Sequence, residues 1–161
     1  MTVNLDNKIN LYHALCKLAD EGASQLKANI AALYANDVQT RASHPINESS
    51  GAAALAESLW HPLMHALPDL ERRDTIIMGG TYQGRDYVGM LGHYCGTFRH
   101  DWLTIPATGR PIYLRYGEVH EVRDGKIVQS NCLWDVLDVI RQAGFWPLAP
   151  SLGSEGMWPG P

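Results

Sequence analysis

The sequence has few cysteines and no long apolar run. Its 161 residues include three cysteines, Cys16, Cys95 and Cys132, which are too few and too widely spaced for a disulfide framework or a CxxC metal knuckle. The amino-terminal residues carry no signal-peptide pattern, and no run of about 18 apolar residues occurs anywhere. We therefore expect a soluble cytoplasmic protein in a reducing compartment, with no membrane partner.

Concentrated positive charge is also missing. Lys and Arg number 13 against 17 Asp and Glu, the net charge is −4, and the basic residues are scattered along the chain. A phosphate backbone needs a basic patch, so we expect no nucleic-acid partner. Neither GxxxxGK nor GxGxxG occurs before a helical segment, which argues against a nucleotide cofactor. His61 and His65 have a metal-ligand spacing, but Pro62 lies between them and no third ligand is evident, so we expect neither cofactor nor metal.

Phenylalanine is scarce, whereas aromatic rings with a polar tip are common. The chain has two Phe against seven His, seven Tyr and five Trp. Such rings suit the lining of a half-wet cavity better than a purely dry core. The length and the 45% hydrophobic content allow one domain, which we assign to residues 1–146. Residues 147–161 hold four Pro and three Gly and are predicted to form a tail without regular structure.

Helical patterns come first along the chain and strand patterns follow. Apolar spacing predicts helix from Leu5 to about Val38 with a break at Gly22, a loop over residues 40–50 with room for a short strand before it, and a helix over 51–67 that Pro68 ends. Strands are predicted over 70–78, 87–98, 112–122 and 127–134, with a tight hairpin at Asp124-Gly125 and a last helix over 135–142. This order predicts an α+β domain whose N-terminal helices cover one face of a curved antiparallel sheet, leaving a cavity between the layers.

Several short motifs, in this order and spacing, resemble a known family. They are Ala66-Leu67-Pro68-Asp69-Leu70, Pro106-Ala107-Thr108-Gly109-Arg110-Pro111, Gly117-Glu118-Val119-His120, Asp124-Gly125-Lys126-Ile127-Val128, Trp134-Asp135 and Arg141-Gln142-Ala143-Gly144. Together they resemble the SnoaL-like, polyketide-cyclase-related proteins of the nuclear transport factor 2-like superfamily, over roughly residues 25–147. The resemblance implies a cone-shaped, cystatin-like α+β fold with an internal pocket, commonly a homodimer, and no metal.

The cyclase chemistry of that family does not carry over residue by residue. In the aldol-condensing cyclases the acid/base aspartate corresponds to Cys132 here, and its partner histidine corresponds to Glu118. Neither residue type is kept. A different acid/base set must therefore be sought in the same pocket.

Strand alternation selects that set. If positions 118 and 132 face the cavity, then Tyr116, Glu118 and His120 face it from one strand, and Ser130, Cys132 and Trp134 from its partner. Glu118 and His120 are the predicted proton-transfer pair, and burial among aromatic rings would raise the pKa of Glu118. The alternative is a buried pair that only fixes the sheet.

Further candidates surround this pair. Of His93 and Tyr94 only one can face inward, and either would polarise a substrate oxygen. Cys132, Tyr116 and Trp134 would contact the substrate, as would His65 from the helix opposite the sheet. Arg99 and Trp102 would lie at the pocket mouth, where Arg99 could hold an anionic group. A solvated loop is the alternative for these two.

Two functions remain open. The first is a cofactor-independent isomerase, cyclase or dehydratase that acts on a small hydrophobic carbonyl or hydroxyl compound. The second is a non-catalytic ligand-binding or accessory domain, which the loss of the cyclase aspartate favours. Within the first class, an epoxide hydrolase is a further version, for which this fold would need an Asp–Arg–Asp set of side chains that the sequence alone does not bring together.

Overall fold

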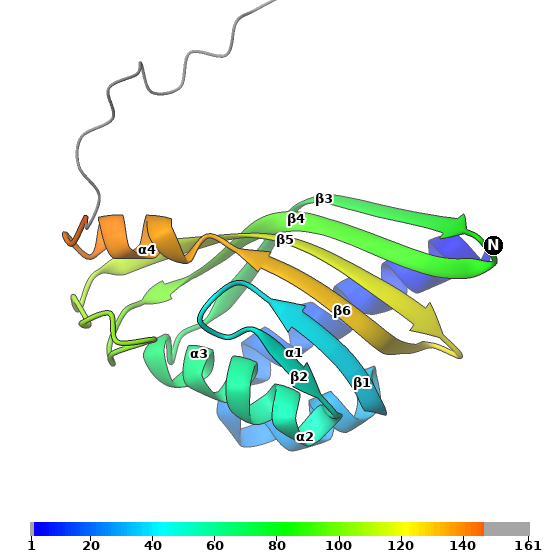
Figure 1. Cartoon of the computed structure of the whole chain (residues 1–161), viewed down its shortest axis with the longest axis horizontal. Helices are drawn as coiled ribbons and strands as arrows, with labels where there is room; N and C mark the ends of the chain where they lie inside the picture. Colours follow the sequence, from blue (N-terminus) through cyan, green and yellow to red (C-terminus); the bar gives the residue numbers. More distant parts are fainter. Residues whose placement is uncertain (1, 147–161) are drawn as a thin grey trace, which may run out of the picture.

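A six-stranded sheet covered on one face by helices forms the protein (Figure 1). The computed structural model describes residues 2–146, so the predicted tail over 147–161 lies outside the described residues. The strands are β1 (Tyr34–Ala42), β2 (Glu48–Ser50), β3 (Glu71–Tyr82), β4 (Arg85–Thr97), β5 (Pro111–Arg123) and β6 (Lys126–Trp134). The helical elements are α1 (Val3–Leu33), α2 (Ala52–Leu55), a π-helical turn η1 (Ala56–Trp60), α3 (His61–Ala66) and α4 (Val136–Gln142). No helix among the described residues is long and apolar enough to span a membrane.

Helix α1 ends earlier than its apolar spacing predicts. Gly22 interrupts it with φ 62° and ψ −160°, as the sequence predicts, and the helix stops at Leu33. The predicted extension to about Val38 is wrong, because Tyr34, Val38 and Thr40 are the buried side chains of strand β1. Tyr34 and Val38 are four residues apart, a spacing that suits one face of a helix and one face of a strand equally well.

The sheet has the order β2-β1-β6-β5-β4-β3. Its four long hairpin-connected strands match the predicted ones within a few residues, and Asp124 and Gly125 both have the positive φ of a tight hairpin, 51° and 74°. One prediction needs correction: the sheet is not purely antiparallel, because β1 pairs with β6 in parallel.

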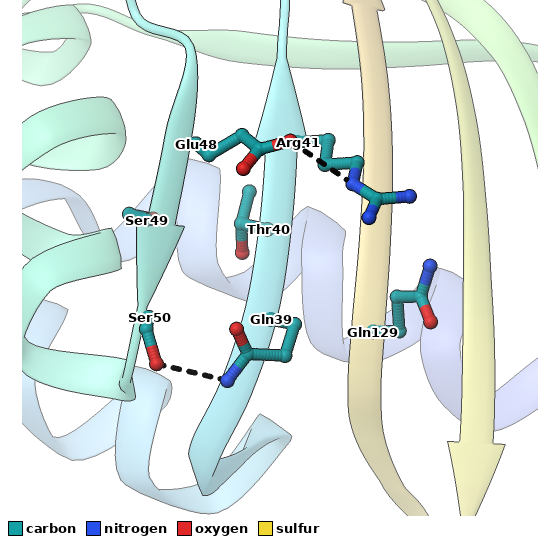
Figure 2. A pocket seen from close by; sticks show the side chains of 7 residues that line it. All are labelled: Gln39, Thr40, Arg41, Glu48, Ser49, Ser50 and Gln129. Carbon is teal, nitrogen blue, oxygen red and sulfur yellow. Dashed lines mark hydrogen bonds and ion pairs between the residues drawn. The ribbon is translucent and has the colours of Figure 1, made fainter.

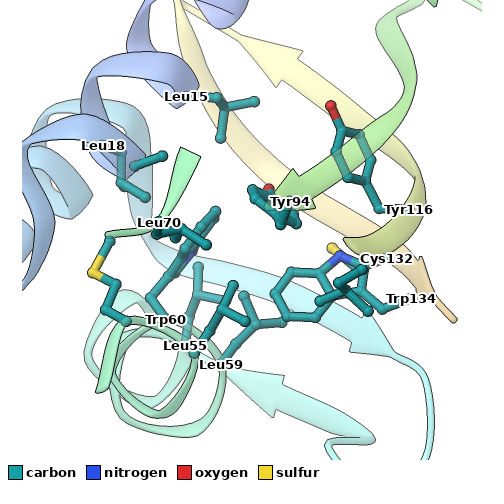
Figure 3. Packing of buried hydrophobic residues seen from close by; sticks show 14 of the residues in the cluster. Leu15, Leu18, Leu55, Leu59, Trp60, Leu70, Tyr94, Tyr116, Cys132 and Trp134 are labelled. Atoms are coloured by element: carbon teal, nitrogen blue, oxygen red, sulfur yellow. The ribbon is translucent and has the colours of Figure 1, made fainter. Parts of the chain in front are cut away.

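The core lies between α1, the α2–α3 stretch and the inner face of the sheet. Leu15 and Leu18 from α1 and Leu59 and Trp60 from the second helical stretch pack toward Tyr94 and Trp134 of the sheet (Figure 3). Trp60 contacts the other two rings edge-on, with centroids 5.9 Å from Tyr94 and 6.2 Å from Trp134. Side chains therefore fill much of the space in which a cavity between the layers is predicted.

An irregularity in β3 sets which of its side chains reach this interior. Asp74 is opposite Gly92 and Ile76 is opposite Leu91, so Thr75 is one extra residue in β3. Such a bulge changes whether the odd-numbered or the even-numbered residues of a strand face the core. Before it the even-numbered Arg72 and Asp74 point inward, and after it Ile77 packs against the core.

The outer face of the sheet is unusually apolar. Leu133 on β6 is 74% exposed, and Ile76, Leu91 and Val119 on the neighbouring strands are each close to half exposed. Helix α4 lies at one end of this face (Figure 1). There the side-chain amide of Gln142 accepts a hydrogen bond from the Tyr113 N–H and donates one to the Tyr113 carbonyl oxygen. Contiguous apolar exposure of this kind marks interaction surfaces.

Candidate active site

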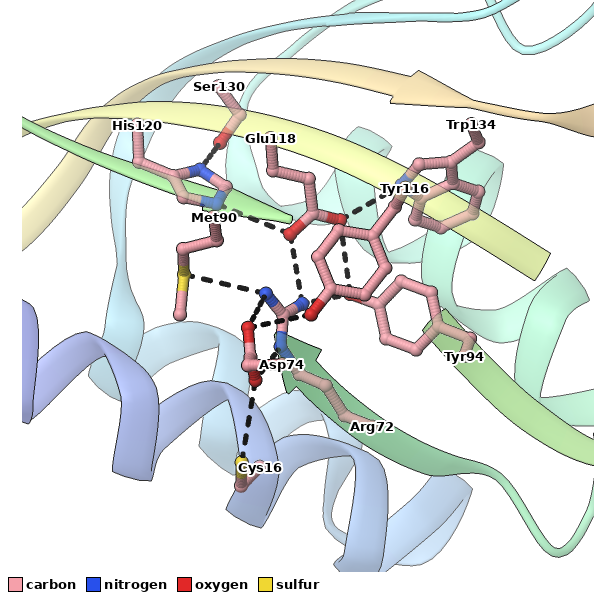
Figure 4. A network of polar contacts seen from close by, with 10 residues as sticks. All are labelled: Cys16, Arg72, Asp74, Met90, Tyr94, Tyr116, Glu118, His120, Ser130 and Trp134. Atoms are coloured by element: carbon pink, nitrogen blue, oxygen red, sulfur yellow. Dashed lines mark hydrogen bonds and ion pairs between the residues drawn. The ribbon is translucent and has the colours of Figure 1, made fainter. Parts of the chain in front are cut away.

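Arg72 is the centre of a buried polar network that involves all four long strands (Figure 4). Its Nε and Nη2 donate to the two oxygens of Asp74, each over 3.0 Å, and its Nη1 donates to Glu118 Oε2 over 2.9 Å. The side chains of all three are at most 2% exposed. One guanidinium thus holds two carboxylates, one from its own strand and one from β5.

Glu118 is surrounded by donors on both oxygens. Oε1 accepts from Trp134 Nε1 over 2.9 Å and from the Tyr94 hydroxyl over 3.1 Å. Oε2 accepts from Arg72 and lies 3.5 Å from Nε2 of His120. Each donor stabilises the charged form of the carboxylate.

The expected direction of the Glu118 pKa is therefore wrong. Burial alone favours the neutral acid, but the Arg72 guanidinium, His120 and the Trp134 N–H outweigh it and lower the pKa of Glu118 to about 2. Aromatic walls raise a carboxyl pKa only where no cation lies among them. Glu118 is a fixed anion at neutral pH.

The two phenols of the network stay protonated. Burial is the main cause that raises the pKa of Tyr94 and of Tyr116, while Arg72 acts against it. Tyr116 donates to Asp74 Oδ1 over 2.6 Å, and the Arg72 guanidinium lies 4.3 Å from the centre of its ring. Tyr94 also accepts a hydrogen bond from Arg72. Both hydroxyls are therefore proton or hydrogen-bond donors.

His120 and Cys132 border this network. His120 Nδ1 is 2.9 Å from Ser130 Oγ, and its Nε2 faces Glu118 at ion-pair distance without hydrogen-bond geometry. Burial, followed by the charge of Glu118, raises the pKa of the Cys132 thiol well above its usual value. The thiol is therefore a poor nucleophile at neutral pH.

The structure brings together some predicted site residues and separates others. Glu118, His120, Tyr94, Tyr116, Cys132 and Trp134 share the interior. His93 points to the outer face of the sheet, opposite Arg115 in the strand register, so Tyr94 is the inward member of that pair. His65 is exposed and stacks on His100 with ring centroids 4.3 Å apart, and Arg99 is exposed in the following loop. His65 and Arg99 therefore lie outside the network.

Trp102 is in the predicted loop but not at the predicted pocket mouth. It is 3% exposed, and its ring centroid lies 6.3 Å from that of Trp134. It belongs to the loop between β4 and β5, as predicted, but it packs into the core and is not exposed at a mouth.

A large cavity lies next to this network. Its volume is about 1100 Å³, and its lining includes Tyr116, Trp134, Leu103, Leu91, Leu133 and Leu137. Because Leu91 and Leu133 are on the outer face of the sheet, the cavity opens on that face and its rim, and not between the layers where an internal pocket is predicted. Tyr116 and Trp134 belong to both the cavity lining and the network.

Two smaller cavities are more polar. One, of about 320 Å³, lies over β1, β2 and β6, where Gln39 bonds Ser50 and Arg41 bonds Glu48 (Figure 2). The other, of about 470 Å³, lies at the hairpin ends around Arg85 and Glu121. Their charged pairs each include an exposed partner, unlike the enclosed set around Arg72.

Sequence reasoning missed Arg72 and Asp74. The signal was the charged run Glu71-Arg72-Arg73-Asp74 at the start of a predicted strand, since charges at positions i and i+2 share one face. Among residues 2–146 no group of three or more His, Cys, Asp or Glu side chains is arranged to hold a metal ion.

The lowered pKa of Glu118 predicts an acid-sensitive fold. An unfolded glutamate has a pKa of about 4.3, so the ionised Glu118 stabilises the folded chain above that pH, and this contribution is lost as the pH falls toward 2. We expect the free energy of unfolding to drop by about 3 kcal/mol from this group, mostly between about pH 4.5 and 2. Urea unfolding of the wild type and of Glu118→Gln across this range measures it.

The variant should show a shallower pH dependence, whatever its stability at pH 7. Glu57→Gln, which changes an exposed glutamate of the second helical stretch, serves as the control and should keep the wild-type slope. Equal slopes in the wild type and Glu118→Gln would contradict the lowered pKa.

Comparisons with known proteins agree with this architecture. The chain is similar to the putative SnoaL-like polyketide cyclase from Jannaschia sp. CCS1, with 16% identity, coverage of 94% of this chain and 98% of that chain, and a TM-score of 0.68. It is similar to AclR, a putative hydroxylase from Streptomyces galilaeus, with 18% identity, coverage of 92% and 91%, and a TM-score of 0.70. It is also similar to IdmH, a putative polyketide cyclase from Streptomyces antibioticus, with 21% identity, coverage of 89% of this chain and 99% of that chain, and a TM-score of 0.66.

These likenesses establish the fold and nothing beyond it, since all three identities are below 25%. No curated protein sequence matches the chain significantly. The family model for SnoaL-like polyketide cyclases, however, matches residues 11–143, which include every strand and all residues of the network. The chain therefore belongs to the SnoaL-like polyketide cyclase family.

Proposed function

We propose that this protein is a cofactor-independent enzyme that transfers protons on a small hydrophobic carbonyl or hydroxyl compound, in an isomerisation, cyclisation or dehydration. The observation that carries the proposal is the buried Arg72 held between Asp74 and Glu118. Replacing a buried ion pair by apolar side chains is often neutral or stabilising, so stability alone is a weak reason for this set. Clustered, perturbed titratable groups are typical of active sites.

The roles follow from the protonation states. Tyr94 and Tyr116 stay protonated, and each would turn its single O–H from its carboxylate partner toward an oxygen that gains negative charge, while Arg72 would supply a fixed positive charge near it. Glu118, as a permanent anion, would hold Arg72 and Trp134 in place. Asp74 and His120 are then the groups left to accept a proton from the substrate.

Substrate would approach from the cavity that Tyr116 and Trp134 line. Tyr116 is bonded to Asp74, so it connects the cavity with the proposed proton acceptor. The polar groups of the network are buried, which requires side chains at this boundary to move before a substrate reaches Asp74.

Epoxide hydrolysis is the second candidate. The structure assembles a carboxylate–arginine–carboxylate set, Asp74–Arg72–Glu118, with glutamate in place of the second aspartate. In this reaction Glu118 would take a proton from a water molecule while the water oxygen attacks an epoxide carbon. The carbon–oxygen bond would break, and the leaving oxygen would take the hydroxyl proton of Tyr116, which lines the cavity beside Arg72.

Two assays separate these candidates without knowledge of the natural substrate. Exchange of the α-protons of 1-tetralone in D₂O, followed by NMR, reports proton abstraction next to a carbonyl. Hydrolysis of styrene oxide in ¹⁸O-labelled water, followed by mass spectrometry, reports epoxide opening. General acid–base catalysis contributes about 10²–10⁴-fold, so we expect Asp74→Asn to reduce the active assay by roughly that factor.

Asp37→Asn changes an exposed aspartate on β1 and is the matched control, with activity expected at the wild-type level. Acceleration of neither reaction, with 1-tetralone nevertheless bound, would overturn the enzymatic proposal. It would favour the non-catalytic ligand-binding domain, which the cysteine at position 132 also supports.

We also propose a homodimer, formed by the outer faces of two sheets, in which the partner sheet would cover the part of the large cavity that Ile76, Leu91 and Leu133 line and substrate would enter at the rim. This face carries the exposed Ile76, Leu91, Val119 and Leu133, and sheets commonly pack face to face through such residues. Light scattering should then give twice the 17.8 kDa of the chain. Leu133→Asp, at the most exposed of the four, should give the monomer mass, whereas Gln83→Asp in the exposed β3–β4 turn should not. A monomeric wild type at micromolar concentration contradicts this proposal.

A further inference from the structure

A row of nitrogen-bearing side chains crosses the outer face of the sheet. The strand register places Arg73 on β3 opposite His93 on β4, and His93 opposite Arg115 on β5. Opposite residues on neighbouring antiparallel strands share one face of the sheet, with Cβ atoms about 5 Å apart. Nε and Nη2 of Arg73 donate to the two oxygens of Glu71 over 3.0 and 2.8 Å. The charge of Arg73 is therefore neutralised within the protein.

Arg115, at the other end of this row, has no such partner. Between residues 2 and 146 its guanidinium makes one ion pair, in which Nη1 is 4.0 Å from Oδ2 of Asp135, beyond hydrogen-bond distance. Oδ1 of Asp135 already accepts the N–H of Asp138 and so caps α4. A guanidinium has five N–H donors. Those of Arg115 are therefore available to a ligand.

His93 and Arg115 both line the large cavity, and so does Leu137 of α4. The next row of the sheet is two residues away along the strands, which is about 7 Å. This row is apolar and lines the same cavity with Ile76, Leu91, Gly117 and Leu133. The cavity therefore combines an extended apolar surface with N–H donors at one place.

These donors lie next to α4, at one end of the outer face. The carbonyl oxygen of Arg115 accepts the N–H of Asp135, at which α4 is capped, and the Arg115 side chain is 65% exposed. In the proposed homodimer the partner sheet covers the apolar row, so the end near α4 is the rim at which substrate would enter. A charged group of the ligand can then stay near water at Arg115 while its apolar part lies deeper.

We propose that Arg115 and His93 bind the carboxylate of a hydrophobic carboxylic acid. The planar fork of Arg115 can donate two parallel hydrogen bonds to a carboxylate, and a ring N–H of His93 can donate a third from the neighbouring strand. The apolar walls of the cavity contact the rest of the molecule. The inference rests on the proposed function in placing the ligand in this cavity, and it adds an acidic group to the proposed carbonyl or hydroxyl compound. It requires binding and does not require turnover.

The test compares two probes of nearly the same shape, 2-naphthoate and the neutral 2-naphthamide, by titration calorimetry at pH 7.5. We expect the wild type to prefer naphthoate by roughly 5-fold to 20-fold in Kd, between the values for an exposed ion pair and for a buried hydrogen bond to a charged group. Arg115→Gln, which keeps a polar side chain and removes the charge, should reduce this preference to about 2-fold or less. The affinity for naphthamide should stay within about 2-fold of the wild type.

Arg99→Gln is the matched control, because it removes the same charge from an exposed arginine that does not line the cavity. It should keep the full preference, although the sequence alone assigns Arg99 to an anionic group. Leu137→Ala shortens an apolar wall of the cavity and tests the other half of the site. It should weaken both probes alike, by roughly 3-fold to 10-fold, and leave the preference unchanged.

Four results would each overturn the inference: no binding of either probe, equal binding of both to the wild type, an undiminished preference in Arg115→Gln, or unchanged affinities in Leu137→Ala. Because the readout is affinity, its failure is distinguishable from failure of the proposed function. A protein that prefers naphthoate but accelerates neither assay reaction would refute the proposed enzyme and leave this inference standing. A protein that exchanges the protons of 1-tetralone but binds both naphthalene probes equally would do the reverse.

Discussion

Replacing Arg72 by methionine is expected to lower the free energy of unfolding by about 3–5 kcal/mol at pH 7, the range for removing one partner of a buried ion pair. Methionine occupies a similar length of side chain, but it leaves Asp74 and Glu118 without their shared cation in an interior with almost no contact with water. Urea unfolding followed by circular dichroism measures the loss.

Arg73→Met is a strict control, since Arg73 is the next residue on the same strand and pairs with Glu71 on the exposed face. Exposed pairs contribute about 0–1 kcal/mol, so this variant should remain near wild-type stability. The double variant Arg72→Met with Glu118→Gln should recover part of the loss, because it removes one of the stranded charges. Equal stability of the Arg72 and Arg73 variants would show that the network does not carry the charge interactions described.

Gly92→Ala is expected to be the most damaging single methyl addition in the sheet. A Cβ at this position would lie 2.2 Å from the carbonyl oxygen of Arg73, 2.9 Å from Asp74 Cα and 2.6 Å from the Tyr116 hydroxyl. Two of these atoms belong to the backbone at the bulge and cannot swing away. Overpacking typically costs 1–3 kcal/mol, and because backbone must move we expect about 3 kcal/mol or more.

Gly89→Ala, on the same strand, tests whether any methyl group on β4 has this effect. Its Cβ would meet only Met78 Cε at 3.6 Å, an ordinary contact, so little change is expected. Combining Gly92→Ala with Tyr116→Phe removes the hydroxyl contact and should restore little, since the backbone contacts remain. Full rescue by Tyr116→Phe would show that the hydroxyl alone determines the need for glycine.

The sequence predicts the order of the elements well because each signal is local. Pro68 after the second helical stretch, Asp124-Gly125 between the last strands and alternation over 112–134 depend on neighbouring residues. The end of α1 is predicted less well, because Tyr34 and Val38 fit either periodicity. The parallel pairing of β1 with β6 joins segments far apart in the chain, and no residue pattern near β1 indicates it.

The site was predicted in part for the same reason. Alternation along β5 and β6 brings Glu118, His120 and Trp134 to one face, as the sequence indicates. Alternation along β3 does not identify Arg72, because the bulge at Thr75 changes which residues face inward and a count back from Ile77 selects Arg73 instead. The missing cation is also why the predicted pKa of Glu118 had the wrong direction.

The parallel pairing of β1 with β6 has a consequence for how the chain folds during synthesis. Apart from the three-residue β2, the sheet partner of β1 is β6, and the Trp134 backbone bonds Ser43 across 91 positions of sequence. A ribosome adds about 5–20 residues per second, so β1 waits roughly 5–20 s for its long partner to be made. During this interval Tyr34 and Val38 have no long strand to pair beside, so we expect their side chains to stay accessible on the nascent chain until residues 126–134 have left the exit tunnel.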